Sequence, residues 1–170
     1  MSDYWLFDWA GSKIRDGGSC DDIGPGIRPQ TLRRYSRHYC VEPCPEYADW
    51  LDARGWQTFR LTALEHLRIG GQYVDALFLL DVIEHMEREE GEEVLRLAQK
   101  AAGQVIVFTP LGFYPQTYTE GEPDAWGLNG GIWQTHRSGW TPEDFPGWEI
   151  KVDPNAHEGH GAFMAIWSRP

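Results

Sequence analysis

The stretch SCDDIGPG, residues 19–26, decides how this chain folds. Residues 19–23 predict a short strand, and the glycines at positions 24 and 26 predict a tight turn directly after it. Because glycine has no Cβ atom, a ligand can approach the backbone closely at such a turn. Open α/β sheets place their ligand crevice at the carboxyl ends of the strands. The stretch therefore places a candidate binding site where the first strand ends.

Acidic residues mark the ends of two further predicted strands. Glu42 closes a strand over residues 39–42 and lies 42 − 22 = 20 residues after Asp22. An acid at this place can accept hydrogen bonds from both hydroxyls of a ribose. Asp81 and the pair Glu84-His85 follow the apolar run 74–80, which is typical of a strand buried on both faces. The order of these features predicts a nucleotide-type site.

The rest of the chain alternates between short strand and helix patterns, which predicts a parallel sheet with crossover helices. We expect an α/β fold in one domain, residues 1–170: a Rossmann-like, mostly parallel sheet flanked by helices, with an antiparallel C-terminal edge pair. Helices are expected over 4–14, from Pro29, over 45–54 and over 87–102. Further strands are expected over 56–61, 104–108, 148–152 and 162–168.

Composition narrows the classes of partner. The formal net charge is −11 and the pI is about 4.9, so the protein's field repels nucleic acid and anionic membrane surfaces. No run approaches the ~20 apolar residues of a membrane span. Residues 1–10 carry acids rather than the basic start of a secretory signal, and an odd count of three cysteines favours reduced thiols. We therefore expect a cytoplasmic protein that binds neither nucleic acid nor membrane.

The runs DIGPG, VEP, LLDVIEH and VIVFTP, in this order within about residues 19–112, resemble the class I S-adenosylmethionine (SAM)-dependent methyltransferases. The resemblance implies SAM as the cofactor and methyl transfer as the reaction. It implies that Asp81 lies beside the reacting methyl group and that Glu42 binds the ribose hydroxyls. The other implied cofactor contacts are Asp22, Gly24 and Gly26 on the methionine and ribose side, and Thr62, Ala63 and Leu64 at the adenine.

A nicotinamide-dependent oxidoreductase is a competing interpretation. A dinucleotide fingerprint has a third glycine three residues after the second, and here that position is Pro29. Proline cannot donate an N–H to a pyrophosphate, whereas SAM has no pyrophosphate to bind. The sulfonium and ammonium of SAM also suit an acidic crevice. These differences favour SAM over a dinucleotide.

Methyl transfer depends mainly on positioning the acceptor, and it needs a base only where the acceptor arrives protonated. The candidates for this catalytic role are Asp81, His85 and His136. Two alternatives stay open: His85 packs structurally, and Asp81 caps the following helix. His157 and His160 have no third ligand in the sequence, so no metal site is predicted.

Residues 109–140 show little periodicity and many glycines, prolines and aromatic residues. A stretch of this length without regular structure is usually functional, and we expect it to cover a small-molecule acceptor. The expected acceptor contacts are Tyr114, Gln116, Trp133, Gln134 and Arg137. Alternatively the tryptophans here form a small core of their own. A second alternative for the whole chain is a methyltransferase-like binding or regulatory module without turnover, since the first crossover is short.

Overall fold

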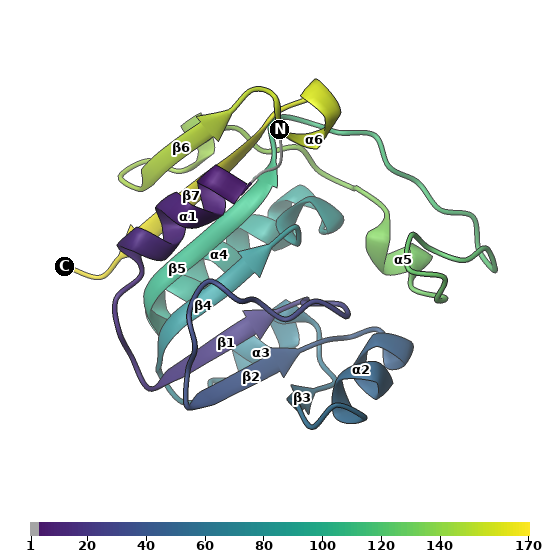
Figure 1. Cartoon of the computed structure of the whole chain (residues 1–170), viewed down its shortest axis with the longest axis horizontal. Coiled ribbons are helices and arrows are strands. Elements are labelled where there is room, and N and C mark those ends of the chain that lie inside the picture. The colour runs from purple at the N-terminus through teal and green to yellow at the C-terminus, as the bar shows by residue number, and fades with distance from the viewer. Residues whose placement is uncertain (1–3) are drawn as a thin grey trace.

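The protein is built around one seven-stranded sheet with the strand order β3-β2-β1-β4-β5-β7-β6 (Figure 1). The computed structural model describes residues 4–170, so the first three residues of the expected domain lie outside it. The pairings from β3 to β5 are parallel, and β7 runs antiparallel to both β5 and β6. This confirms the expected Rossmann-like α/β fold with an antiparallel C-terminal pair. The strands are β1 (Ser19–Ile23), β2 (Arg37–Val41), β3 (Gln57–Phe59), β4 (Val74–Leu80), β5 (Ala102–Pro110), β6 (Glu149–Asp153) and β7 (Ala162–Ser168).

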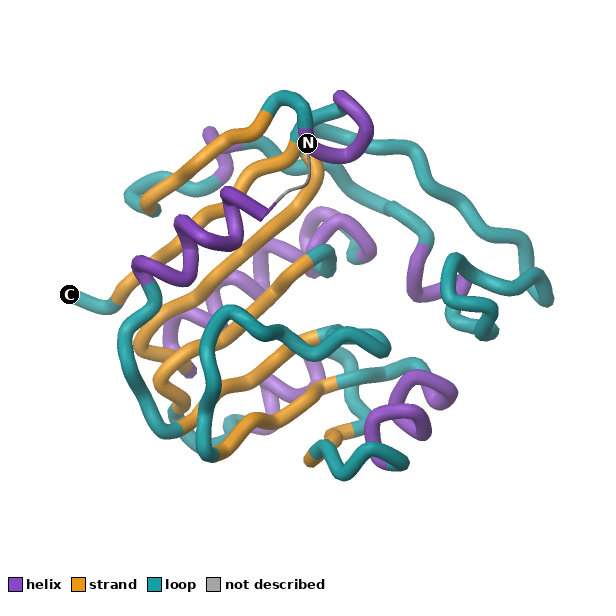
Figure 2. Tube along the Cα trace, viewed as in Figure 1, coloured by secondary structure: helices purple, strands orange, loops and turns teal. Residues whose placement is uncertain are grey.

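Helices cover both faces of the sheet, as Figure 2 shows. Strand β4 alternates between two cores: Leu77 and Leu79 pack with the residues of one helical layer, and Ala76 and Phe78 with those of the other. The first layer contains α3 (Ala63–Ile69) and α4 (Arg88–Ala101), and the second contains α1 (Tyr4–Lys13). Helix α2 (Pro45–Asp52) contacts β3. No helix among residues 4–170 is long and apolar enough to span a membrane.

The prediction of a helix that begins at Pro29 is wrong, because residues 24–36 form an irregular loop. Gln30 explains much of this conformation. Its backbone N–H donates to Asp22 at 2.7 Å, and its side chain bonds both the N–H and the C=O of Arg33. These contacts satisfy backbone groups that a helix would otherwise pair. Leu32 and Tyr35 from the same loop pack on the α1 side of the core.

Helix α3 was not predicted, although its beginning carries a recognisable signal. Thr62 accepts a hydrogen bond from the N–H of Glu65, and the Glu65 carboxylate accepts one from the N–H of Thr62. This reciprocal pair is a capping box, and the pattern Thr-x-x-Glu that encodes it is visible in the sequence. The remaining short helical segments are 3-10 turns η1 (Ile83–His85) and η2 (Pro142–Asp144), and helices α5 (Gly131–Gln134) and α6 (Ala156–Gly159).

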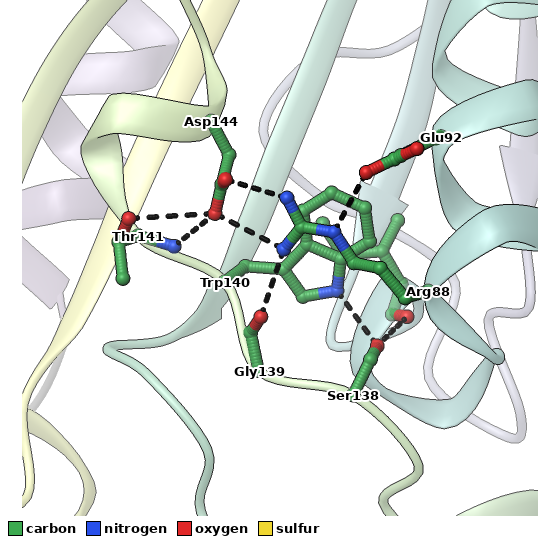
Figure 3. A network of polar contacts seen from close by, with 8 residues as sticks. Arg88, Glu92, Ser138, Gly139, Trp140, Thr141 and Asp144 are labelled. Carbon is green, nitrogen blue, oxygen red and sulfur yellow. Dashed lines mark hydrogen bonds and ion pairs between the residues drawn. The ribbon is translucent and has the colours of Figure 1, made fainter.

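A polar network joins the end of the long 109–140 loop to the start of α4 (Figure 3). The Arg88 guanidinium pairs with Asp144 and donates to the Gly139 carbonyl at 3.0 Å. It also lies 4.0 Å from the ring centroid of Trp140, whose indole N–H donates to Ser138 at 2.9 Å. Trp140 is only 1% exposed. The alternative of a structural role for the loop tryptophans therefore holds for this one.

Gly91 in α4 gives a test of how tightly Trp140 is packed. Alanine normally stabilises a helix interior by about 0.5–1 kcal/mol relative to glycine. Here an added Cβ would lie 2.5 Å from Cζ2 of the buried Trp140 ring. We expect Gly91→Ala to lower the free energy of unfolding by about 1–3 kcal/mol in a denaturant titration, because the ring must shift.

Gly11 in α1 is the matched control, since an added Cβ there meets nothing closer than 3.8 Å. Gly11→Ala should leave the stability unchanged or raise it. Equal free energies of unfolding for the two variants would contradict the packing described for Trp140.

Candidate functional site

The carboxylate of Glu42 connects the ends of β1 and β2. Its Oε2 accepts the N–H of Gly26 and its Oε1 accepts the N–H of Cys44, each at 2.9 Å. Gly24 and Gly26 have φ angles of 60° and 57°, a left-handed conformation that favours glycine. Burial raises the pKa of Glu42 to about 7, although the two N–H donors oppose this. The predicted glycine turn and the predicted acid thus form one unit.

Asp22 lies beside this unit and is 2% exposed. Its Oδ2 accepts the N–H of Gln30 and pairs with Nε2 of His38 at 3.0 Å. Burial raises the pKa of Asp22, and the hydrogen bond from His38 opposes the rise. Sequence reasoning did not identify His38, because its place beside Asp22 follows from the β1–β2 register, in which His38 is opposite Cys20 and Asp22 is opposite Cys40.

A first cavity of about 390 Å³ opens at the carboxyl ends of β1, β2 and β4. This is the crevice expected for an open α/β sheet. Its walls come from the glycine turn, the end of β2, the start of α3 and the α5 segment. The lining residues that the sequence had indicated are Gly24, Glu42, Thr62, Ala63, Asp81, His85, Trp133, Gln134 and Arg137.

A second cavity of about 500 Å³ adjoins the first. Four residues line both: Gly24, Asp81, His85 and Gln134. The second cavity also contains predicted residues that the first lacks, namely Asp22, Tyr114, Gln116 and His136. A ligand in the first cavity can therefore meet a ligand in the second beside Asp81 and His85.

Two predicted residues line neither cavity. Leu64 packs against the hydrophobic core and lines neither cavity, and the adenine contact expected of it stays a prediction. Gly26 lies beneath Trp126, and an added Cβ would collide with that indole ring. The roles expected for the other residues remain predictions, since position alone does not assign them.

Two histidines meet at the floor of the second cavity. The ring centroids of His85 and His136 lie 4.8 Å apart. Burial lowers the pKa of His85 to about 4, with the neighbouring His136 adding to the effect, and burial also lowers the pKa of His136. Both imidazoles are therefore neutral at neutral pH. Asp81 is not the cap of the following 3-10 turn, because Val82 holds that position.

Residues of the 109–140 loop line both cavities, and the loop, which runs toward α2 in Figure 1, is anchored to that helix. Asp124 accepts hydrogen bonds from the hydroxyl of Tyr47 and from three loop amides, those of residues 126, 128 and 130. Asn129 donates to Glu46 through both its backbone and its side-chain nitrogen. Trp126 packs edge-on against Tyr47 at 5.1 Å between ring centroids. Sequence reasoning missed Asp124, Trp126 and Tyr47 because their contacts join distant segments.

Comparison with known proteins gives the class of fold. No protein-family model and no curated protein sequence matches this chain. Solved structures do match. The small RNA methyltransferase HEN1 is 18% identical to this chain, with a TM-score of 0.61. The match covers 99% of this chain and 25% of the HEN1 chain, so this chain spans a quarter of the length of HEN1. A SAM-dependent methyltransferase from Archaeoglobus fulgidus is 12% identical with a TM-score of 0.61, over 98% of this chain and 97% of that one.

The N-terminal domain of EvdMO1, determined with S-adenosylhomocysteine (SAH) bound, is 11% identical to this chain with a TM-score of 0.65. The match covers 96% of this chain and 79% of the EvdMO1 chain. The fold of this protein is therefore that of the class I SAM-dependent methyltransferases, as the sequence motifs had implied.

The hydrogen bonds of Asp124 predict that the loop opens more readily when this carboxylate is removed. Removing its carboxylate in Asp124→Ala leaves three loop amides without their acceptor. A charged hydrogen bond contributes about 1.5–3 kcal/mol, so amide exchange of residues 126–130 should quicken by about tenfold or more. Hydrogen–deuterium exchange measures this directly. Tyr47→Phe removes only one donor and should have a smaller effect, and the amides of β4 serve as the internal control. Unchanged exchange at residues 126–130 would rule out this anchor.

Proposed function

We propose that the protein is a methyltransferase that binds SAM in the first cavity and methylates a small-molecule acceptor in the second. The observation that carries this proposal is the place of Glu42, a buried carboxylate at the end of β2 that lines the first cavity. An acid there can accept hydrogen bonds from the ribose hydroxyls of an adenosine group. The methyltransferase fold supports SAM rather than a dinucleotide, and Pro29 still lacks the N–H that a pyrophosphate needs.

The acceptor side is built from polar groups set among aromatic ones. Tyr114, Gln116 and His136 line the second cavity, and Gln134 lies between the two cavities. This mixture suits a compact acceptor that carries hydroxyl groups. A fold of this class hosts many acceptors, so the fold itself does not select one. The net charge of −11 favours a small molecule over a polyanion, although one structural neighbour is named as a small RNA methyltransferase.

Calorimetric titration of SAM and of SAH into the purified protein tests the cofactor site. We expect micromolar dissociation constants, weakened at least tenfold in Glu42→Ala because charged hydrogen bonds to the ribose are lost. NADH should not bind. A subsequent screen with methyl-labelled SAM against hydroxylated small molecules and a short RNA tests turnover.

Asp21→Ala is the matched control for the loss of an acid at the end of β1. Asp21 is buried like Glu42, but it pairs with His66 at 2.8 Å and lines neither cavity. The Asp21→Ala variant should bind SAH with the same affinity as the unaltered chain. Absence of SAM and SAH binding would overturn the proposal, and binding without methyl transfer to any acceptor would favour a regulatory module.

Glu42 also predicts how cofactor binding depends on pH. With its pKa raised to about 7, the carboxyl is mostly protonated at pH 6 and mostly ionised at pH 8. If only the ionised form accepts both ribose hydroxyls, the affinity for SAH should rise about tenfold from pH 6 to pH 8. The raised pKa has the opposite effect on the free energy of unfolding. The protonated Glu42 stabilises the folded chain fully below its ordinary pKa of 4.5, and this contribution is lost as the pH rises through about 7.

Calorimetry at three pH values with the unaltered chain and with Glu42→Gln measures this dependence. The amide of the variant does not titrate, so its weaker SAH affinity should stay flat between pH 6 and pH 8. An equal slope in both proteins would assign the pH dependence to another group.

A further inference from the structure

Three side chains from two segments converge at the floor of the second cavity. Glu84 and His85 belong to η1, and His136 belongs to the 109–140 loop. One possible ligand atom from each residue lies within 4.8 Å of those from the other two. All three residues line the second cavity. The cluster therefore has access to the place where an acceptor would lie.

Glu84 carries a buried oxygen that the fold does not use. The residue is 2% exposed, and its Oε2 accepts the hydroxyl of Thr109 at 3.0 Å. Its Oε1 is buried and has no hydrogen-bond partner among the residues that the structure describes. A buried carboxylate oxygen without a partner is costly, and such exceptions call for an explanation such as a bound ion.

Backbone carbonyls fix the tautomers of both histidines. Nδ1 of His85 lies 3.3 Å from the carbonyl oxygen of Thr135, and Nδ1 of His136 lies 2.6 Å from that of Tyr114. A carbonyl oxygen only accepts, so each Nδ1 carries the proton and each Nε2 carries the lone pair. Metal-binding histidines are oriented in this way, by a hydrogen bond from the second ring nitrogen.

A second cluster of possible metal ligands differs from the first in how well its polar groups are already satisfied. Asp22, His38 and Cys40 also lie close enough to share an ion. However, Asp22 already pairs with His38 and accepts the N–H of Gln30, and neither His38 nor Cys40 lines either cavity. That cluster satisfies its own polar groups, whereas the Glu84 cluster leaves an oxygen unsatisfied beside a cavity.

We propose that Glu84, His85 and His136 form a binding site for a divalent first-row transition metal ion. Two imidazoles and one carboxylate are a donor set that such ions favour. Bonds of about 2.1 Å to one ion would hold the three ligand atoms about 3 Å from one another, so the ion would draw them closer than the 4.8 Å within which they now lie. Three protein ligands leave further coordination positions open to the second cavity.

The role of this ion rests on the function proposed above, whereas the binding site itself does not. A hydroxyl group of the acceptor that coordinates the ion has a lowered pKa, and its proton is released to water. A lone pair of the resulting oxygen forms the new bond to the methyl carbon of SAM. The sulfur–methyl bond breaks with its electron pair passing to sulfur, so the products are a methyl ether and SAH.

Titration of Co²⁺ into the chain, freed of any histidine tag, tests the site through visible absorption and calorimetry. We expect one Co²⁺ ion per chain with micromolar affinity, and visible absorption bands of Co²⁺ bound by nitrogen and oxygen. Glu84→Gln preserves volume but removes the anionic ligand, and His136→Ala removes an imidazole. Each should weaken Co²⁺ binding at least tenfold.

His66→Ala is the control, because His66 is a partly buried histidine that pairs with Asp21 and lines neither cavity. Its Co²⁺ affinity should equal that of the unaltered chain. Absence of Co²⁺ binding at millimolar concentration overturns the metal site, and so does a Co²⁺ affinity of Glu84→Gln and His136→Ala that equals the affinity of the unaltered chain. SAH binding measured in parallel separates the two proposals: SAH binding without Co²⁺ binding removes the metal site alone, and Co²⁺ binding without SAH binding removes the methyltransferase function alone.

Discussion

The structure depends on one constraint: backbone N–H groups beyond the carboxyl ends of the parallel strands have no ladder partner and still must be satisfied. Acidic side chains supply the acceptors here. Glu42 takes the N–H groups of Gly26 and Cys44, and Asp22 takes that of Gln30. Asp124 does the same for three amides of the long loop. The cavities lie where they do because these carboxylates hold the surrounding loops in fixed conformations.

The same constraint determines the electrostatics of the site. Burial raises the pKa of Asp22, Glu42 and Glu84, and for Glu84 the nearby charge of Asp81 raises it further. A cation that enters this edge of the sheet stabilises the ionised carboxylates. The cationic sulfonium of SAM and a divalent ion both have this property. An acidic site that is costly in the empty protein is thus suited to positively charged ligands.

Much of the sheet could be predicted from the sequence, because strands such as β4 are local apolar runs whose meaning does not depend on distant residues. The strand-end residues Asp22, Glu42 and Asp81 followed from the same local logic. The prediction of a helix from Pro29 was wrong because Gln30 makes specific contacts with Asp22 and Arg33. The hydrophobic periodicity of the sequence does not indicate such contacts. The contacts of Tyr47 with Asp124 and of Glu84 with Thr109 join residues 77 and 25 positions apart. Such contacts exist only once the chain has folded.

The 109–140 loop couples the two cavities physically. At one end His136 reaches the floor of the second cavity, and the backbone N–H groups of Arg137 and Ser138 donate to the Glu84 carbonyl. In its middle, Trp126 covers the turn at Gly26, whose N–H is held by Glu42. The segment between them, α5, contributes Gln134 to both cavities. Trp126 itself lines the second cavity, whereas Trp133 and Arg137 of the same loop line the first. A displacement of the loop therefore disturbs both cavities, so ligands in the two cavities are expected to bind interdependently.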